Sequence, residues 1–215
     1  KELTVMFCDM RGFTKMSEKM EPIQLQELLN SVFTRLTSLI RANRGTIDKY
    51  MGDCVMAFWG APVEDPAHAD HAVEAALAMQ AEVRRMSAAF VMRGLPPLAV
   101  GIGINTGDML IGLFGSERAN QYTVLGHHVN LAARLCNFAA GNEVLATLGT
   151  VQEISRFAKQ YPNEITIPIK FRTKAQIEVK GIAEPVTVDR PFLFFIVDNG
   201  TGAVLFVGRV LDPTA

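Results

Sequence analysis

The stretch LTVMFCDMRGFT, residues 3–14, decides the fold of this chain of 215 residues. Its first six residues are apolar except for one threonine, so they predict a buried strand over residues 3–8. Asp9 follows that strand at once, and Gly12 marks a turn. A single carboxylate in such a place is more often a turn residue satisfied by its surroundings than a ligand. Asp9 therefore needs a partner before it indicates a site.

The next elements along the chain supply a second carboxylate. A helix is predicted from about Pro22, because proline suits the first helical turn, and residues 43–45 end it. One apolar stripe repeats along it at the helical period: Leu25, Leu28, Leu29, Val32, Phe33, Leu36, Leu39 and Ile40. Strands over 46–50 and 54–59 then form a hairpin whose turn contains Asp53. We expect Asp53 to face Asp9 across adjacent strands.

The remaining pattern predicts one α+β domain. Alternating elements are expected as a helix over 66–92, a strand over 98–104, a strand over 109–114 that pairs back against it, a short strand over 121–125, helices over 129–138 and 151–159, and strands over 165–171, 175–179 and 186–188. The order β-α-β-β-α-β, followed by further helices and strands, fits a ferredoxin-like α+β sandwich.

Composition excludes several classes of protein. Hydrophobic residues make up 49% and charged residues 20%, which is ordinary for a globular domain, and the net charge of −1 gives no attraction for nucleic acid. Three widely spaced cysteines predict reduced thiols in the cytoplasm rather than a disulfide framework. A strand begins almost at the first residue, so we expect a piece of a longer protein with an upstream sensor, linker or membrane region.

The two carboxylates fit a metal-dependent reaction on phosphate. Carboxylate oxygens are hard ligands that suit Mg²⁺ or Mn²⁺. Two of them can hold a pair of cations about 3.5–4 Å apart, which supports in-line displacement at phosphorus. Backbone amides after Gly12, at Phe13 and Thr14, could cradle phosphate oxygens.

Five segments in order resemble the signatures of class III adenylate and guanylate cyclases, over about residues 2–188. They are FCDMRGFT (7–14), KYMGD (49–53), VGIGINTG (100–107), YTVLG with VNLAAR (122–126 and 129–134) and VKG (179–181). The resemblance implies the class III nucleotide cyclase fold and the domain limits 1–188.

The resemblance also implies a role for each matching residue. Asp9 and Asp53 would bind two divalent cations, Mg²⁺ or Mn²⁺, with the carbonyl of Met10 as a further ligand. The amides of Phe13 and Thr14, and the side chain of Lys180, would hold the phosphates. Asn130 and Arg134 would orient the ribose and stabilise the pentavalent phosphorus, and their spacing of four places them on one face of a helix.

Lys49 and Thr123 occupy the positions that read the purine. A lysine can donate to the adenine N1, and a threonine hydroxyl can accept from the 6-amino group. Guanylate cyclases of this family have Glu and Cys at the matching positions, so the resemblance favours ATP and cyclic AMP over GTP. Because the family joins the carboxylates of one subunit to the other residues of its partner, a homodimer with two equivalent sites is implied.

Two alternatives remain. The chain could be a catalytically silent module that binds nucleotide and dimerises, or it could be a guanylate cyclase. A diguanylate cyclase is disfavoured, because its Gly-Gly-acidic-acidic-Phe signature is absent.

Other features carry less chemistry. His127 and His128, and also His68 and His71, are expected to be exposed residues on their helices rather than metal ligands. Residues 189–215 resemble the C-terminal strand pair of serpins and predict a β-hairpin around Asn199-Gly200. Since both strands are apolar on both faces, we expect the hairpin to pack on the main sheet or at a subunit contact.

Overall fold

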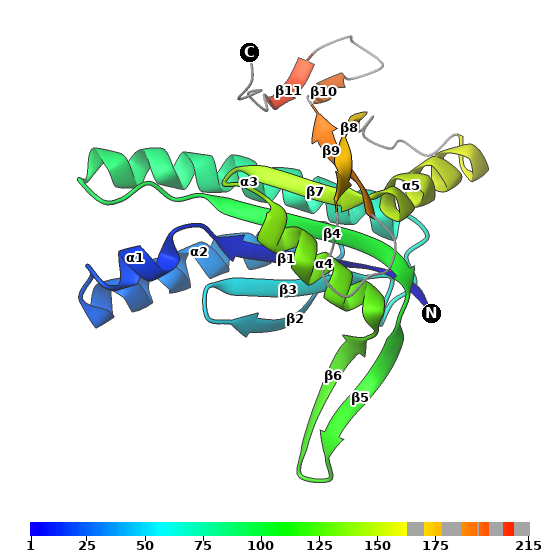
Figure 1. Ribbon diagram of the computed structural model, residues 1–215, viewed down its shortest axis with the longest axis horizontal. Helices are drawn as coiled ribbons and strands as arrows, with labels where there is room; N and C mark the ends of the chain where they lie inside the picture. Colours follow the sequence, from blue (N-terminus) through cyan, green and yellow to red (C-terminus); the bar gives the residue numbers. More distant parts are fainter. Residues whose placement is uncertain (163–169, 178–185, 193, 198–203, 209–215) are drawn as a thin grey trace.

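The computed structural model describes residues 1–162, 170–177, 186–192, 194–197 and 204–208. A twisted seven-stranded sheet runs through the middle of the molecule (Figure 1). Its strands are, in order across the sheet, β2 (Thr46–Met51), β3 (Cys54–Trp59), β1 (Glu2–Met10), β4 (Val100–Asp108), β7 (Glu143–Thr147), β9 (Val186–Phe192) and β8 (Lys170–Ile177). The described helices are α1 (Phe13–Ser17), α2 (Pro22–Ala42), α3 (His68–Met92), α4 (His127–Phe138) and α5 (Leu148–Gln160).

The order β4-β1-β3-β2, with each neighbouring pair antiparallel, is that of a ferredoxin-like unit. β7 extends it in parallel to β4, and β9 and β8 continue it in antiparallel fashion. The expected α+β fold is therefore confirmed.

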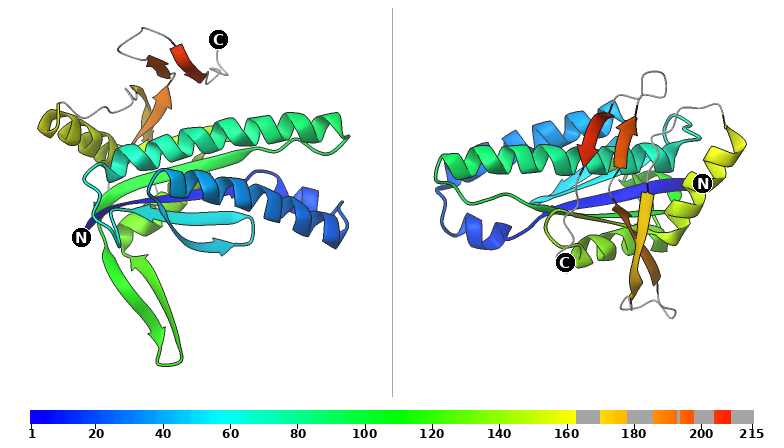
Figure 2. Two further views of the ribbon diagram at one scale, coloured as in Figure 1. Left: turned by 180° about the vertical axis from the view of Figure 1, so that it is seen from behind. Right: turned by 90° about the horizontal axis from the view of Figure 1, so that it is seen from above.

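Side chains of β1 alternate between two cores, because successive residues of a strand point to opposite faces. Met6, Cys8 and Met10 pack with α2 and α3. Leu3, Val5 and Phe7 pack with α4. Figure 2, seen from above, shows the sheet between these two layers. Since Asp9 continues the second series, it lies on the face that α4 covers.

Helix α2 forms as its sequence predicts. Pro22 occupies its first turn, and Leu28, Val32, Leu36 and Ile40 are its buried residues. Burying each such side chain contributes about 1.5–3 kcal/mol. The amide of Gly45 donates to the carbonyl of Ile40 at 2.8 Å and ends the helix. The residues from 43 to 45 thus end it as expected.

One expected strand pairing is wrong. β5 (Leu110–Ser116) does not pair back against β4 but forms a separate two-stranded sheet with β6 (Ala119–Leu125). β4 is instead paired with β1 along its whole length and with β7 over residues 101–104, so β7 occupies the edge that β5 would need. Figure 1 shows the β5–β6 hairpin extending away from the body of the domain. We call this hairpin, residues 110–125, the arm.

The C-terminal part adds two findings. The sequence reasoning missed β7, a buried five-residue strand. β10 (Phe194–Val197) and β11 (Val204–Gly208) pair antiparallel as a separate two-stranded sheet, which confirms a hairpin in the tail, whereas its expected turn at Asn199-Gly200 lies outside the described residues. β9 spans residues 186–192 and so runs across the expected domain limit at 188.

Candidate active site

The two carboxylates lie together at one end of the sheet. Asp9 is the next-to-last residue of β1 and stands opposite Cys54, the residue that follows Asp53 in the β2–β3 turn. Burial, and then the negative charge of Asp9, raise the pKa of the Asp53 carboxyl. Two like charges that destabilise one another in this way favour a bound cation. The structure therefore brings together the pair that the sequence predicts.

Arg11 holds one of these carboxylates, which the sequence reasoning missed. Its Nη1 donates to Oδ2 of Asp9 at 2.6 Å. Its Nε donates to the carbonyl of Ala139 at 3.0 Å, and its Nη2 donates to the carbonyl of Cys136. The guanidinium passes over Gly101, where an added Cβ would lie 2.1 Å from Nη2. Arg11 thus fixes Asp9 from the end of α4.

The residues predicted to bind through their backbone, Met10, Phe13 and Thr14, come soon after Asp9 in the chain. Met10 buries its side chain in the core with α2 and α3, which leaves only its backbone for the site. Phe13 and Thr14 begin α1 after Gly12, which has a left-handed φ of 73°. Amides in the first turn of a helix have no helical acceptor and can therefore donate to an anion.

The structure also brings the two predicted purine-reading residues together. Lys49 pairs with Met56 across the β2–β3 hairpin, and Met56 packs with α4, so Lys49 is on the same face as Asp9. Thr123 lies on β6, and its hydroxyl donates to Oδ2 of Asp48. Nζ of Lys49 lies 3.1 Å from Oδ1 of the same Asp48. One carboxylate therefore joins both side chains, and the sequence reasoning did not single it out.

Asn130 and Arg134 occupy successive turns of α4. Asn130 is exposed and Arg134 is half-buried. Within the part of the chain that the structure describes, neither side chain has a hydrogen-bond or ion-pair partner. The predicted transition-state pair is thus available to a ligand. Lys180, the predicted phosphate ligand, lies outside the described residues.

The cysteines near the carboxylates are poorly suited to bind a metal. Burial raises the pKa of Cys54 to about 12 and that of Cys136 to about 11, and it raises the pKa of Cys8. These thiols therefore stay protonated at neutral pH and bind hard cations poorly. Among the described residues there is no group of three or more His, Cys, Asp or Glu that could hold a metal. Of the predicted metal ligands, Asp9 and Asp53 are the side-chain donors that the described part of one chain provides.

Two expectations about histidines are wrong. His68 is not exposed but 6% accessible, and its Nδ1 lies 2.7 Å from the hydroxyl of Thr4. His71 is half-buried and pairs with Asp65 at 2.7 Å. Thr4 is 64 residues from His68, whereas Asp65 is only six residues from His71 and lies directly before the expected helix.

The two histidines of the second pair, His127 and His128, differ in their exposure to solvent. His127 is exposed as expected, whereas His128 is half-buried and lies 3.0 Å from the side-chain amide of Asn105. Burial, and then the neighbouring His127, lower the pKa of His128.

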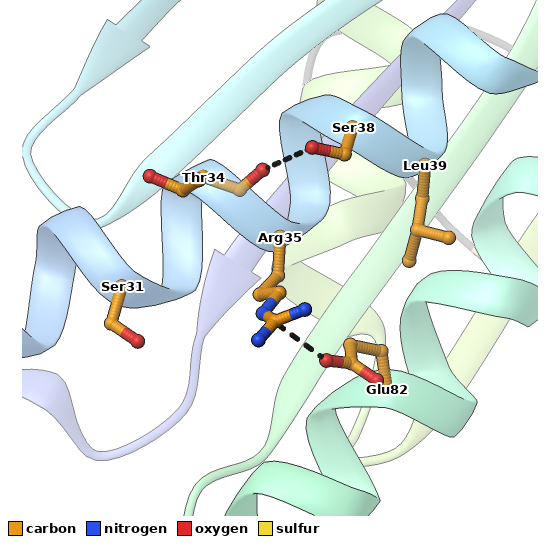
Figure 3. Close-up of a pocket in the computed structure, with 6 residues that line it drawn as sticks. All are labelled: Ser31, Thr34, Arg35, Ser38, Leu39 and Glu82. Carbon is orange, nitrogen blue, oxygen red and sulfur yellow. Dashed lines mark hydrogen bonds and ion pairs between the residues drawn. The ribbon is translucent and has the colours of Figure 1, made fainter.

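A groove elsewhere on the molecule does not compete with this site. It lies between α2 and α3, has a volume of about 470 Å³ and is lined by Ser31, Thr34, Arg35, Ser38, Leu39 and Glu82 (Figure 3). Arg35 and Glu82 pair across it at 3.7 Å, and Glu82 also pairs with Arg85. Its one carboxylate is therefore already paired, and the groove lies on the opposite face of the sheet from α4.

The sequence model of the family described as "Adenylate and Guanylate cyclase catalytic domain" matches residues 1–192. The chain belongs to this family. It is 36% identical over 190 residues to adenylate cyclase 1 of Rhizobium meliloti, an alignment that covers 86% of this chain and 28% of that protein. The chain thus spans less than a third of the length of that curated relative.

Solved cyclase domains have the same fold. The adenylyl cyclase CyaB from P. aeruginosa is 36% identical, with a TM-score of 0.81 over 88% of this chain and 93% of that one. The guanylyl cyclase Cya2 is 29% identical, with a TM-score of 0.77 over 100% of this chain and 95% of that one. The cyclase family therefore includes similar domains named for either purine. None of the helices described in this cyclase domain is long and apolar enough to cross a membrane.

Proposed function

We propose that this cyclase domain converts ATP to 3′,5′-cyclic AMP and pyrophosphate. The observation that carries the proposal is that Lys49 and Thr123 both contact the carboxylate of Asp48. It places a donor and a hydroxyl side by side, as recognition of the adenine N1 and 6-amino group requires. Relatives named adenylate cyclase at 35–36% identity support the choice of purine.

Guanine would require the opposite pattern of donors and acceptors. Its N1 carries a hydrogen and its O6 is an acceptor, so a lysine facing N1 would be repelled. The Glu and Cys that the family uses to read guanine are replaced here by Lys49 and Thr123. GTP is therefore the weaker substrate.

Two divalent cations fit the carboxylate pair. Burial and the repulsion by Asp9 already raise the pKa of Asp53, and a cation between these carboxylates would relieve both effects. Asp9, Asp53 and the carbonyl of Met10 would hold Mg²⁺ or Mn²⁺. When bound, the cations would lower the pKa of the attacking hydroxyl and neutralise phosphate charge.

The remaining residues bind and orient the nucleotide. The amides of Phe13 and Thr14, together with Lys180, hold the phosphates. Asn130 orients the ribose, and the guanidinium of Arg134 stabilises the charge that develops on the α-phosphate. The 3′-oxygen forms a bond to the α-phosphorus as the bond to the bridging oxygen breaks. The hydroxyl proton passes to solvent, and pyrophosphate leaves.

We place this site at the interface of a homodimer. The arm exposes Leu110, Leu113, Tyr122 and Leu125, and Leu113 is 70% accessible. A two-stranded hairpin with such side chains is marginally stable alone and gains from being covered. A second copy of the chain would cover the arm and supply the half-site that each carboxylate pair lacks.

The wider setting is also a proposal. Free thiols at Cys8, Cys54 and Cys136, and a substrate found inside cells, support a cytoplasmic location. The curated relative is more than three times as long as the matched region, which supports an upstream sensor or membrane region in the full-length protein.

The decisive experiment incubates the protein with ATP or GTP and Mg²⁺ or Mn²⁺ and identifies the cyclic product by chromatography. We expect cyclic AMP to dominate. Asp53→Ala should abolish turnover while the circular dichroism spectrum stays unchanged, and Glu27→Ala, an exposed carboxylate on α2, serves as the matched control. Nucleotide binding with no cyclic product would instead identify a silent dimerisation module.

A further inference from the structure

Asp48 occupies an irregular position in the sheet. In the β2–β3 pair Ile47 stands opposite Ala57 and Lys49 opposite Met56, so Asp48 is an extra residue, a β-bulge. A bulge redirects the side chains beside it and is common next to active sites. Here it turns the carboxylate of Asp48 toward β6. That side chain is fully buried, with 0% of its surface accessible.

The buried carboxylate accepts from three side chains. The hydroxyl of Thr123 donates to Oδ2. Nζ of Lys49 lies 3.1 Å from Oδ1, and Nε2 of Gln121 lies 3.3 Å from the same oxygen. Gln121 also donates to the backbone carbonyl of Asp48 at 3.1 Å. Asp48 is thus held between β2 and β6 and links the two strands that carry the purine-reading residues.

The contact with Thr123 determines what that hydroxyl can do next. A hydroxyl has one hydrogen and two lone pairs, whereas a carboxylate only accepts. The single hydrogen of Thr123 is therefore used by Asp48, and only lone pairs remain for a ligand. A lone pair can accept from the 6-amino group of adenine, but it repels the 6-oxo group of guanine or hypoxanthine.

We propose that Asp48 is a specificity-determining positioning residue, which makes Thr123 an obligate acceptor and thereby selects 6-amino over 6-oxo purines. The proposal rests on the proposed cyclase function. Asp48 acts through Thr123 and does not itself contact the nucleotide. Without Asp48, the hydroxyl of Thr123 could rotate and donate to a 6-oxo group.

Asp48→Asn tests this with little change in shape. An amide can donate as well as accept, so Thr123 regains both orientations. The substrates are ATP and inosine triphosphate, which has the 6-oxo group but lacks the 2-amino group of guanine. We expect the ratio of kcat/KM for inosine triphosphate to that for ATP to rise about ten-fold, the size of one misdirected hydrogen bond.

The second contact of Asp48 offers a competing route to the same result. Weakening its pairing with Lys49 would free the ammonium, and a lysine can donate to a 6-oxo group. That route does not need the hydroxyl of Thr123. A rise in relative use of inosine triphosphate therefore reports Thr123 only if it disappears when the hydroxyl is removed.

Two further variants separate specificity from simple loosening of the strands. Gln121→Ala removes another hydrogen bond from Asp48 without touching Thr123, so the substrate ratio should stay at the wild-type value. In a Thr123→Val background there is no hydroxyl to orient, so adding Asp48→Asn should leave the ratio unchanged. If Gln121→Ala changes the ratio as much as Asp48→Asn, or if Asp48→Asn still acts in the Thr123→Val background, the proposal is wrong.

The outcome is distinguishable from failure of the proposed function. If the wild-type protein makes no cyclic nucleotide from any triphosphate, the cyclase proposal fails. If the wild type makes cyclic AMP and the folded Asp48→Asn variant, checked by its melting temperature, keeps the wild-type substrate ratio, only the role of Asp48 is overturned.

Discussion

Asp70 carries a buried carboxylate that the fold does not satisfy. It lies in the first turn of α3 and is 2% accessible. Within the described part of the chain, neither of its carboxylate oxygens has a hydrogen-bond partner. Burial, and then the charge of Glu74, raise the pKa of Asp70 from 3.8 to about 6, although its own backbone amide and His71 act in the opposite direction. Asp70 is therefore a source of instability at neutral pH.

The pKa gives the size of this effect. One pKa unit corresponds to about 1.4 kcal/mol, so keeping Asp70 ionised in the folded protein costs about 3 kcal/mol at pH 7. The folded state binds the proton more tightly than the unfolded chain. Stability is therefore lost as the pH rises from about 4 to about 6, and the loss is complete above pH 7.

We predict that Asp70→Asn stabilises the protein, because the amide keeps the shape and removes the charge. At pH 7.5 the free energy of unfolding should rise by about 2 kcal/mol, because the buried amide without a partner offsets about 1 kcal/mol of the roughly 3 kcal/mol released. The corresponding increase in Tm is about 5 °C. The gain should shrink by about 2 kcal/mol between pH 7.5 and pH 4.5, where the wild-type carboxyl is largely protonated when folded.

Urea unfolding of both proteins at several pH values measures this directly. Asp108→Asn, at an exposed position on β4, is the matched control and should change stability little at any pH. A gain that stays constant from pH 4.5 to pH 7.5 would refute the reasoning, because it could not come from the ionisation of Asp70. So would a loss of stability at pH 7.5.

Two other predictions concern packing and assembly. Gly103→Ala should lower the free energy of unfolding by about 2 kcal/mol or more, as measured by thermal melts. Its Cβ would lie 2.3 Å from the amide nitrogen of Cys136 and 2.5 Å from the carbonyl of Ala132. Gly112→Ala is the control and should have little effect, because its nearest neighbour would lie at 3.8 Å. Leu113→Asp on the arm should weaken the homodimer, so that sedimentation shows monomer and specific activity falls on dilution; unchanged mass and dilution-independent activity would contradict the proposed assembly.

Elements with a strong and isolated pattern could be predicted from the sequence. The apolar run of β1 predicts a buried strand, and the apolar stripe of α2 repeats at the helical period over many residues. The structure contains both elements. β7 was missed because it is five residues long and α5 begins directly after Thr147, so no polar gap marks its end. The predicted partner of β5 was wrong because the alternation of apolar and polar residues shows which face of a strand is buried, but not which strand lies beside it.

The site shows the same division. The proposed site residues could be found in the sequence, because strand ends and glycine turns position them. Their supporting partners could not. Arg11 is only two residues from Asp9, but the carbonyls that hold its guanidinium there, those of Cys136 and Ala139, are 125 and 128 residues away. Asp48 reaches Thr123 across 75 residues through a bulge that no spacing reveals. His68 was misread for a similar reason, since its partner Thr4 is 64 residues away.

These supporting partners have a common effect on the chemistry. Asp9 is held by Arg11, and Lys49 by Asp48, before any ligand arrives. Each contact fixes a side chain on a strand, so the proposed reaction would need little reorganisation when charge develops on the phosphate. Asn130 and Arg134, by contrast, have no such partner among the described residues of one chain. One chain therefore contains a carboxylate held in place by Arg11 and a guanidinium, that of Arg134, with no partner in the part of the chain that the structure describes. This difference is a physical reason, independent of the family, to expect that a second subunit completes the site.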